Sequence, residues 1–266
     1  LMAYILVEKA NFFFREGNVK EALVISQDAK LLCRRRHCES HGISVRASHL
    51  YGLCQASLAN FESAHAIYST CIHTIQSHTG CEHPEYCAVI ISMAELCYLR
   101  GLLEEATKLN KMVLISLRQS GFSNNHPLAL QAQLNLMEIE TQSTRKCTQA
   151  LELICSKLKR RLNIHPRVAI GHLSLARVKG FIGDDFEAQY NAEKALSIAL
   201  KLYGNSSNHI FVAVCRIFVA KHLIRASFYD YAKQTLAEAK RTVLLFCEEQ
   251  VGNMNHPLCA LLLKTF

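Results

Sequence analysis

One short pattern recurs along the chain at nearly constant spacing, and it constrains the fold more than any other feature. The pattern begins with His-Pro and has an apolar residue followed by a small one about nine residues later. A glycine at an expected turn comes next, and an alanine ends the pattern. Its clearest copies begin at His83-Pro84 and His165-Pro166. The alanine recurs about every 42 residues, at Ala22, Ala64, Ala106, Ala150, Ala188 and Ala232. A period of this length is typical of proteins built from stacked repeats.

Each part of the pattern has a role in a pair of antiparallel helices. Proline is tolerated in the first turn of a helix, where its missing N–H would be unpaired anyway, and the preceding histidine can cap that turn. Glycines such as Gly17, Gly101 and Gly183 permit the backbone to end one helix and turn back. Small residues at fixed offsets let neighbouring helices pack closely. The sequence therefore predicts an all-α fold, a right-handed α-solenoid of about six antiparallel helix pairs.

The spacing also predicts the repeat boundaries. We expect one solenoid segment, 1–266, with repeats at about 1–40, 41–82, 83–125, 126–164, 165–208 and 209–254. Residues 255–266 would then begin a seventh repeat and expose Leu261, Leu262 and Leu263. Because the end repeats of a solenoid normally carry a polar outer face, we expect the chain to be part of a longer protein.

Composition narrows the class of protein further. The net charge of +8 suits an acidic partner. The twelve cysteines show no regular disulfide spacing, and Cys54, Cys71, Cys97 and Cys215 fall on apolar helical faces, where a thiol packs as a small hydrophobe. This cysteine usage favours a reducing, cytoplasmic compartment. The sequence has no apolar run of 18 residues and thus predicts no membrane span.

The repeat resembles the tetratricopeptide repeat (TPR), in the 42-residue variety of kinesin light chains. The matching residues are His126-Pro127 with Leu134-Asn135-Leu136, His165-Pro166 with Leu173 to Ala176, and Leu202-Tyr203-Gly204. The resemblance covers essentially the whole chain. It implies that the first helix of each pair lines a concave groove. It further implies a non-enzymatic scaffold or adaptor that binds an extended peptide or a partner helix in this groove.

Placing each repeat on the shared register predicts the side chains that face the groove. The predicted peptide-binding residues are Asn11, Arg46, His49, Glu95, Tyr98, Arg177, Lys221 and Arg225. The last three form a basic wall beside the apolar residues Leu173 and Ile217. Arginine offers a planar fork to a carboxylate, so this wall would suit an acidic residue next to an apolar or aromatic one.

Other kinds of site are disfavoured. The groups Cys33, His37, Cys38, His41 and Cys81, His83, Cys87 lack the paired spacing of zinc ligands, so we expect no metal and no cofactor. The basic runs 34–36 and 157–161 lie near predicted helix ends, where cations complement the helix dipole, and they lack the aromatic residues of a nucleic-acid surface. No phosphate-binding, dinucleotide-binding or hydrolase motif occurs, so we expect no enzymatic activity and no nucleic-acid partner.

Two alternative functions stay open at this point. The segment could be a structural spacer in a large ciliary, microtubule-associated or cargo-transport complex, which would place it at the cytoskeleton. It could also be the regulatory arm of an enzyme whose catalytic domain lies outside this segment.

Overall fold

The described part of the chain is helical throughout. The computed structural model describes residues 1–36, 42–81, 83–141, 148–204, 208–252 and 256–265. Within these ranges there is no strand, which confirms the predicted all-α class. Internal contacts divide the chain into two compact units, Leu1–Ala132 and Gln133–Phe266. The boundary falls inside helix α7 (Pro127–Thr141).

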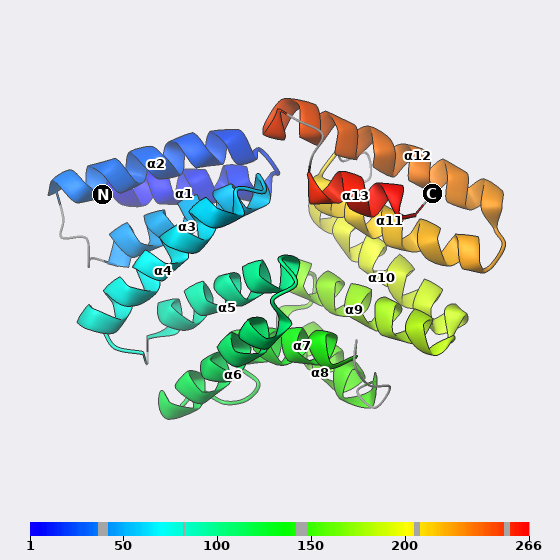
Figure 1. Cartoon of the computed structure of the whole chain (residues 1–266), viewed down its shortest axis with the longest axis horizontal. Coiled ribbons are helices and arrows are strands. Elements are labelled where there is room, and N and C mark those ends of the chain that lie inside the picture. The colour runs from blue at the N-terminus through cyan, green and yellow to red at the C-terminus, as the bar shows by residue number, and fades with distance from the viewer. Residues whose placement is uncertain (37–41, 82, 142–147, 205–207, 253–255, 266) are drawn as a thin grey trace. The chain divides into compact units, whose positions relative to one another are not determined.

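The first unit contains three helix pairs followed by the start of α7 (Figure 1). The helices are α1 (Met2–Arg15), α2 (Val19–Arg36), α3 (Gly42–Ser57), α4 (Phe61–His78), α5 (Pro84–Leu99) and α6 (Leu103–Gln119). Each helix from α1 to α5 packs against the next one in the sequence. In addition, α1 contacts α3 and α3 contacts α5. The first helices of successive pairs therefore share one wall of this unit.

The second unit contains the remainder of α7 and six further helices. They are α8 (Thr148–Leu162), α9 (Pro166–Ile182), α10 (Asp185–Tyr203), α11 (Ile210–Arg225), α12 (Tyr229–Phe246) and α13 (Pro257–Leu263), with a π-helical turn η2 (Cys247–Val251) after α12. Here α9 contacts α8, α10 and also α11, so the first helices again lie side by side. No helix among the described residues is both long enough and apolar enough to cross a bilayer.

Five of the turns between paired helices share one geometry. A residue with positive φ follows the first helix in each of them, at Gly17, Ala59, Gly101, Gly183 and Ser227. The amide of the next residue then donates to a carbonyl five residues earlier, for example from Asn18 to Phe13 at 2.9 Å. This is the Schellman arrangement that ends many helices. It explains why glycine marks three of these turns, and it also occurs in two turns without glycine.

Four His-Pro pairs cap first helices as the sequence predicts, and His209, which precedes Ile210, caps α11 in the same way. In each case the imidazole Nδ1 accepts a hydrogen bond from the amide two residues later, at 3.1–3.3 Å. The capping residues are His83, His126, His165, His209 and His256. This bond satisfies one of the amides that a helix N-terminus leaves without an internal partner.

The fourth residue of each second helix is buried, and it marks the repeat better than alanine alone. Ala22, Ala64, Ala106, Ala188 and Ala232 all occupy this place. The predicted register of the fourth repeat was wrong by one residue, because α8 begins at Thr148 and puts Leu151 in the fourth place. Leu151 is fully buried whereas Ala150 is exposed. The bulkier leucine fills the position that alanine fills elsewhere.

The cysteines of the apolar faces pack inside the protein. Cys54, Cys71, Cys97 and Cys215 are buried, as their positions predict. Burial raises the pKa of the Cys54, Cys71 and Cys215 thiols to about 12 and that of Cys97 to about 11. These thiols therefore stay protonated and act as small hydrophobic groups.

Candidate functional site

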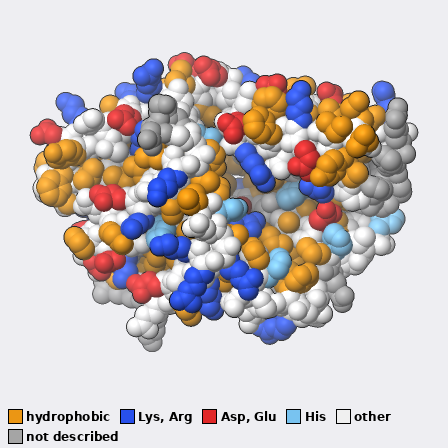
Figure 2. Space-filling view, turned by 180° about the vertical axis from the view of Figure 1, so that it is seen from behind, with side chains coloured by type: hydrophobic (Ala, Val, Ile, Leu, Met, Phe, Trp, Pro, Cys, Tyr) orange, Lys and Arg blue, Asp and Glu red, His pale blue; other side chains and the backbone are white. Residues whose placement is uncertain are grey.

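The second unit contains a pocket that collects the predicted basic wall. Its volume is about 330 Å³. The lining residues come from α7, α9 and α11: Glu138, Arg177, Val178, Phe181, Phe218, Lys221, His222 and Arg225. Arg177, Lys221 and Arg225, which the repeat register predicts to face inward, thus line one pocket. Figure 2 shows Lys and Arg side chains lying among hydrophobic ones on the face in view.

Helical spacing explains why these side chains converge. Phe218, Lys221 and Arg225 are three and seven residues apart on α11, which places them on one face of the helix. Arg177 and Phe181 are four residues apart on α9, which packs beside α11. Each of the two helices therefore contributes both basic and aromatic side chains to the pocket.

The guanidinium of Arg177 is already neutralised inside the protein. Arg177 forms an ion pair with Glu138 of α7, whose side chain is only 13% exposed. The other carboxylate oxygen of Glu138 accepts a hydrogen bond from Ser174 Oγ at 3.0 Å. The guanidinium also lies 5.3 Å from the ring centre of Phe218, a cation–π distance. Arg177 thus joins α7, α9 and α11.

The guanidinium of Arg225 is also bound within the protein. Its Nη1 donates to the carbonyl oxygen of Gly180 at 2.7 Å and lies 3.3 Å from Oδ1 of Asp185. The close approach depends on the absence of a side chain at position 180. A Cβ there would lie 2.7 Å from Arg225 Nη1 and 2.7 Å from His222 Cε1.

Lys221 differs from the two arginines. It forms no hydrogen bond or ion pair with any residue that the structure describes. Burial lowers the pKa of its ammonium group, and the positive charges of Arg225 and Arg177 lower it further. The surroundings of Lys221 therefore favour an additional negative charge.

His222 follows Lys221 in the sequence and also lines the pocket. It is 2% exposed, and neither Nδ1 nor Nε2 has a hydrogen-bond partner within the described part of the chain. Burial, followed by the charges of Arg225 and Lys221, lowers its pKa to about 4. The imidazole is thus neutral at pH 7 and keeps one donor and one acceptor.

The apolar part of the pocket differs from the sequence prediction. Leu173 and Ile217 are buried in the interior instead of facing the pocket. Val178, Phe181 and Phe218 take that role, and the Phe181 side chain is 66% exposed. The register on α11 placed the apolar residue one position too early. The spacing of Phe218 to Lys221 and Arg225 would have identified it.

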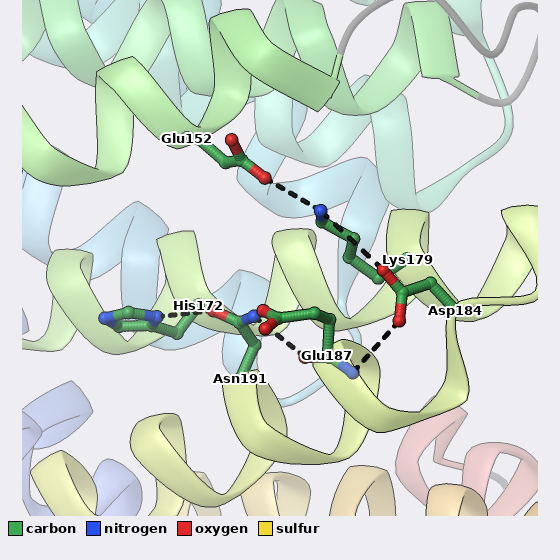
Figure 3. Close-up of polar contacts among 6 residues, drawn as sticks. All are labelled: Glu152, His172, Lys179, Asp184, Glu187 and Asn191. Atoms are coloured by element: carbon green, nitrogen blue, oxygen red, sulfur yellow. Dashed lines mark hydrogen bonds and ion pairs between the residues drawn. The ribbon is translucent and has the colours of Figure 1, made fainter.

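A polar network holds α9 in place beside the pocket (Figure 3). Lys179 Nζ lies 2.8 Å from Glu152 of α8 and 3.9 Å from Asp184 in the turn before α10. The hydrogen bond to Glu152 raises the pKa of Lys179. Two turns earlier on α9, His172 shares a 2.9 Å hydrogen bond with Asn191 of α10. These contacts fix the helix that carries Arg177 and Phe181.

In the first unit, the predicted residues of α3 make internal contacts. Arg46 pairs with Glu8 at 3.0 Å and lies 6.0 Å from the ring centre of Tyr4. His49 shares a 2.9 Å hydrogen bond with Ser92, and burial lowers its pKa to about 4. These contacts join α3 to α1 and α5, so they stabilise the wall of first helices.

The other predicted residues of this unit lie on α1 and α5. Asn11 and Tyr98 are half-buried. Glu95 is exposed and accepts a hydrogen bond from Gln131 at 3.4 Å. A separate pocket of about 190 Å³ in this unit is lined by other residues, from α2, α3 and α4.

The two groups of cysteine and histidine have separate structural roles where they are described. His83 caps α5, and the buried Cys87 thiol lies 3.6 Å from Ser116 Oγ. Of the first group only Cys33 is described and it is buried, while His37, Cys38 and His41 lie outside the described residues. Within the described ranges no group of three metal-ligating side chains comes together.

Comparison with known proteins identifies the fold. No protein-family model and no curated protein sequence matches the chain. TPR-like repeats from Podosopora anserina, in a protein assigned to the kinesin light chains, superpose with a TM-score of 0.54 at 19% identity, over 74% of this chain and 94% of theirs. BtubC (BKLC) from P. vanneervenii gives a TM-score of 0.59 at 17% identity, over 84% and 90%.

A third solved structure extends the match along almost the whole chain. The Rap conjugation gene regulator of the plasmid pLS20, in complex with a Phr peptide, has a TM-score of 0.65 at 15% identity, over 99% of this chain and 73% of that one. These superpositions agree with the repeat pattern, the paired helices and the wall of first helices. The chain therefore has the fold of the tetratricopeptide-repeat proteins.

Proposed function

We propose that this chain is a non-enzymatic protein-interaction module that binds an extended, acidic segment of another protein at the basic pocket of α9 and α11. The observation that carries the proposal is the convergence of Arg177, Lys221 and Arg225 around an apolar floor. The repeat register predicts that these three residues, which come from two different repeats, face the groove. All three line the same pocket.

The chemistry of the pocket supports an acidic peptide over other ligands. Basic side chains attract and orient a carboxylate, while the exposed Phe181 ring offers apolar contact beside them. The Rap regulator, which has the same fold, was solved in complex with a peptide, so a protein of this fold can bind one. Because the identity is only 15%, the Rap complex supports peptide binding by this fold and does not identify the partner of this chain.

A photo-crosslinking experiment tests this proposal. The photoreactive amino acid p-benzoylphenylalanine replaces Phe181 in the full chain, and a matched variant carries it at Tyr231 of α12. Both positions are similarly exposed, at 66% and 69%, but only Phe181 lines the pocket. The probes are acidic and basic nonapeptides, blocked at both ends and each carrying a biotin tag.

We expect acidic peptides to crosslink at position 181 much more than at 231, and the yield to fall as salt screens the charges. Equal yields at the two positions, or equal yields from acidic and basic peptides, would reject the proposal. The structural-spacer and regulatory-arm hypotheses, and association with the cytoskeleton, stay predictions.

A further inference from the structure

The three basic residues of the pocket have different amounts of charge left for a ligand. We infer that the pocket binds a single side-chain carboxylate, an Asp or Glu of the partner segment, and that Lys221 is the residue that binds it. This inference rests on the function proposed above and specifies which residue determines specificity. It assigns Arg177 and Arg225 to holding the walls of the pocket.

The charge of Arg177 is matched by Glu138. The carboxylate is largely buried and is bonded by both Arg177 and Ser174. Pulling the guanidinium toward a ligand would leave this carboxylate poorly compensated, which is costly for a buried charge. Arg177 therefore stays with Glu138.

Arg225 forms an ion pair with Asp185, and its Nη1 donates a hydrogen bond to the Gly180 carbonyl. The two contacts join the end of α11 to the end of α9 and the start of α10. Moving Arg225 toward a ligand would remove the donor from the Gly180 carbonyl and the cation from Asp185, so Arg225 stays in this junction.

Lys221 is left with an unmatched positive charge. Three cations and one carboxylate line the pocket, and Asp185 pairs with one of the cations from outside the lining. Two ion pairs therefore account for both arginines, and the ammonium of Lys221 remains. A carboxylate placed there relieves both the desolvation of Lys221 and its repulsion by Arg225 and Arg177.

The balance of charge also selects the class of anion. A carboxylate carries one negative charge and neutralises Lys221 completely. A phosphate group carries between one and a half and two charges at pH 7, by the general chemistry of phosphoamino acids, and would leave excess negative charge against the apolar floor of Val178 and Phe218. The pocket therefore matches Asp or Glu better than a phosphorylated residue.

His222 provides a second, independent indication of a ligand. Two ring nitrogens that are buried and have no partner in the described chain are unfavourable. His222 lines the same pocket as Lys221, so a carboxylate bound to Lys221 offers an acceptor for the N–H of the imidazole.

The position of the pocket favours a side chain over a chain terminus. Its lining residues come from three successive first helices, α7, α9 and α11, so the pocket is part of a wall and not a closed end. A segment lying along this wall presents its side chains to the pocket and continues on both sides.

Peptide libraries test the inference. The main library consists of nonapeptides blocked at both ends, with one central aspartate and varied apolar neighbours. Three matched libraries replace this aspartate by asparagine, by phosphoserine, or by asparagine with a free C-terminal carboxylate. Affinities are measured by fluorescence polarisation with the full chain, with Lys221→Met, and with Lys240→Met, which removes an exposed lysine of α12 outside the pocket.

We expect the best aspartate peptides to weaken at least tenfold on Lys221→Met and on Asp-to-Asn replacement, and to keep their affinity on Lys240→Met. Full affinity of Lys221→Met for peptides that still need their aspartate would overturn the inference and leave the proposed function standing. Tighter binding of the phosphoserine peptides, or of the peptides with a free C-terminus, would likewise overturn the inference and leave the proposed function standing. If no aspartate peptide binds the folded protein, both the inference and the proposed function are wrong.

Discussion

Arg225 Nη1 donates a hydrogen bond to the carbonyl oxygen of Gly180, 45 residues earlier in the chain, at 2.7 Å. The bond joins the C-terminal end of α11 to the last turn of α9. It is possible because position 180 has no side chain, and the space where a Cβ would lie is occupied by Arg225 and His222. One glycine thus determines how two walls of the pocket meet.

Gly180→Ala should lower the free energy of unfolding by about 1 kcal/mol, because the cost of overpacking exceeds the gain in helix propensity. Chemical denaturation measures this change. The matched variant is Gly42→Ala at the start of α3, where the nearest atom to an added Cβ is 3.9 Å away. That variant should be neutral or slightly stabilising. If Gly180→Ala stabilised the protein instead, the side chains of Arg225 and His222 would have room for a methyl group at position 180.

Ala59→Gly should stabilise the protein by about 0.5–1 kcal/mol. Ala59 has a φ of 62°, in the left-handed region where glycine fits without strain. The control is Ala66→Gly at an exposed position inside α4, which should cost about 0.5–1 kcal/mol. Thermal unfolding of both variants gives the comparison. A loss of stability in both would contradict the strain at Ala59.

His83→Ala should cost about 1 kcal/mol, because it removes the acceptor for the amide of Glu85 at the start of α5. His83→Asn keeps a side-chain acceptor and should retain most of the stability. The measurement is urea denaturation at pH 8. Equal losses in the two variants would mean that the histidine cap contributes through some other contact.

Stability should decrease as the pH falls from 6.5 toward 4. The pKa of His222 is lowered from 6.5 to about 4, first by burial and then by Arg225 and Lys221, so the unfolded chain binds this proton more readily. The free energy of unfolding then rises with pH across this window. His222 alone should account for about 2 kcal/mol between pH 5 and pH 8.

Denaturation of His222→Leu at both pH values checks this prediction. The variant should lose about 2 kcal/mol less than the natural chain on going from pH 8 to pH 5. His49, whose pKa is also about 4, is unchanged in the variant and should leave a remaining slope of the same sign. Identical pH dependence in the two proteins would mean that His222 is accessible to protons in the folded state.

The spacing of the repeats was sufficient to predict the helix pairs and the histidine caps. Both follow from local rules, since a His-Pro pair starts a helix and a residue with positive φ ends it. The error at Ala150 arose where the sequence signal was weakest, because no glycine occurs between α7 and α8. The buried Leu151 shows that packing requires an apolar residue at that place and not specifically a small one.

The basic wall was predictable, but the different roles of its residues were not. The register placed Arg177, Lys221 and Arg225 on one side. The partners of the two arginines, Glu138 and Asp185, lie 39 and 40 residues away in the sequence, and only the fold brings them within reach. The same limitation applies to His222, because only the packing of α9 against α11 shows that its ring is buried and lines the pocket.

A charge exchange at Lys221 shows whether this residue binds the acidic side chain of the partner segment. Lys221→Glu is compared with the natural chain for binding of the best aspartate nonapeptide and of the same peptide with lysine in place of aspartate. We expect the variant to bind the aspartate peptide at least tenfold more weakly and the lysine peptide more tightly, because the exchange restores a pair of opposite charges. If Lys221→Glu binds the aspartate peptide as tightly as before, the pocket of α9 and α11 is not where an acidic segment is bound.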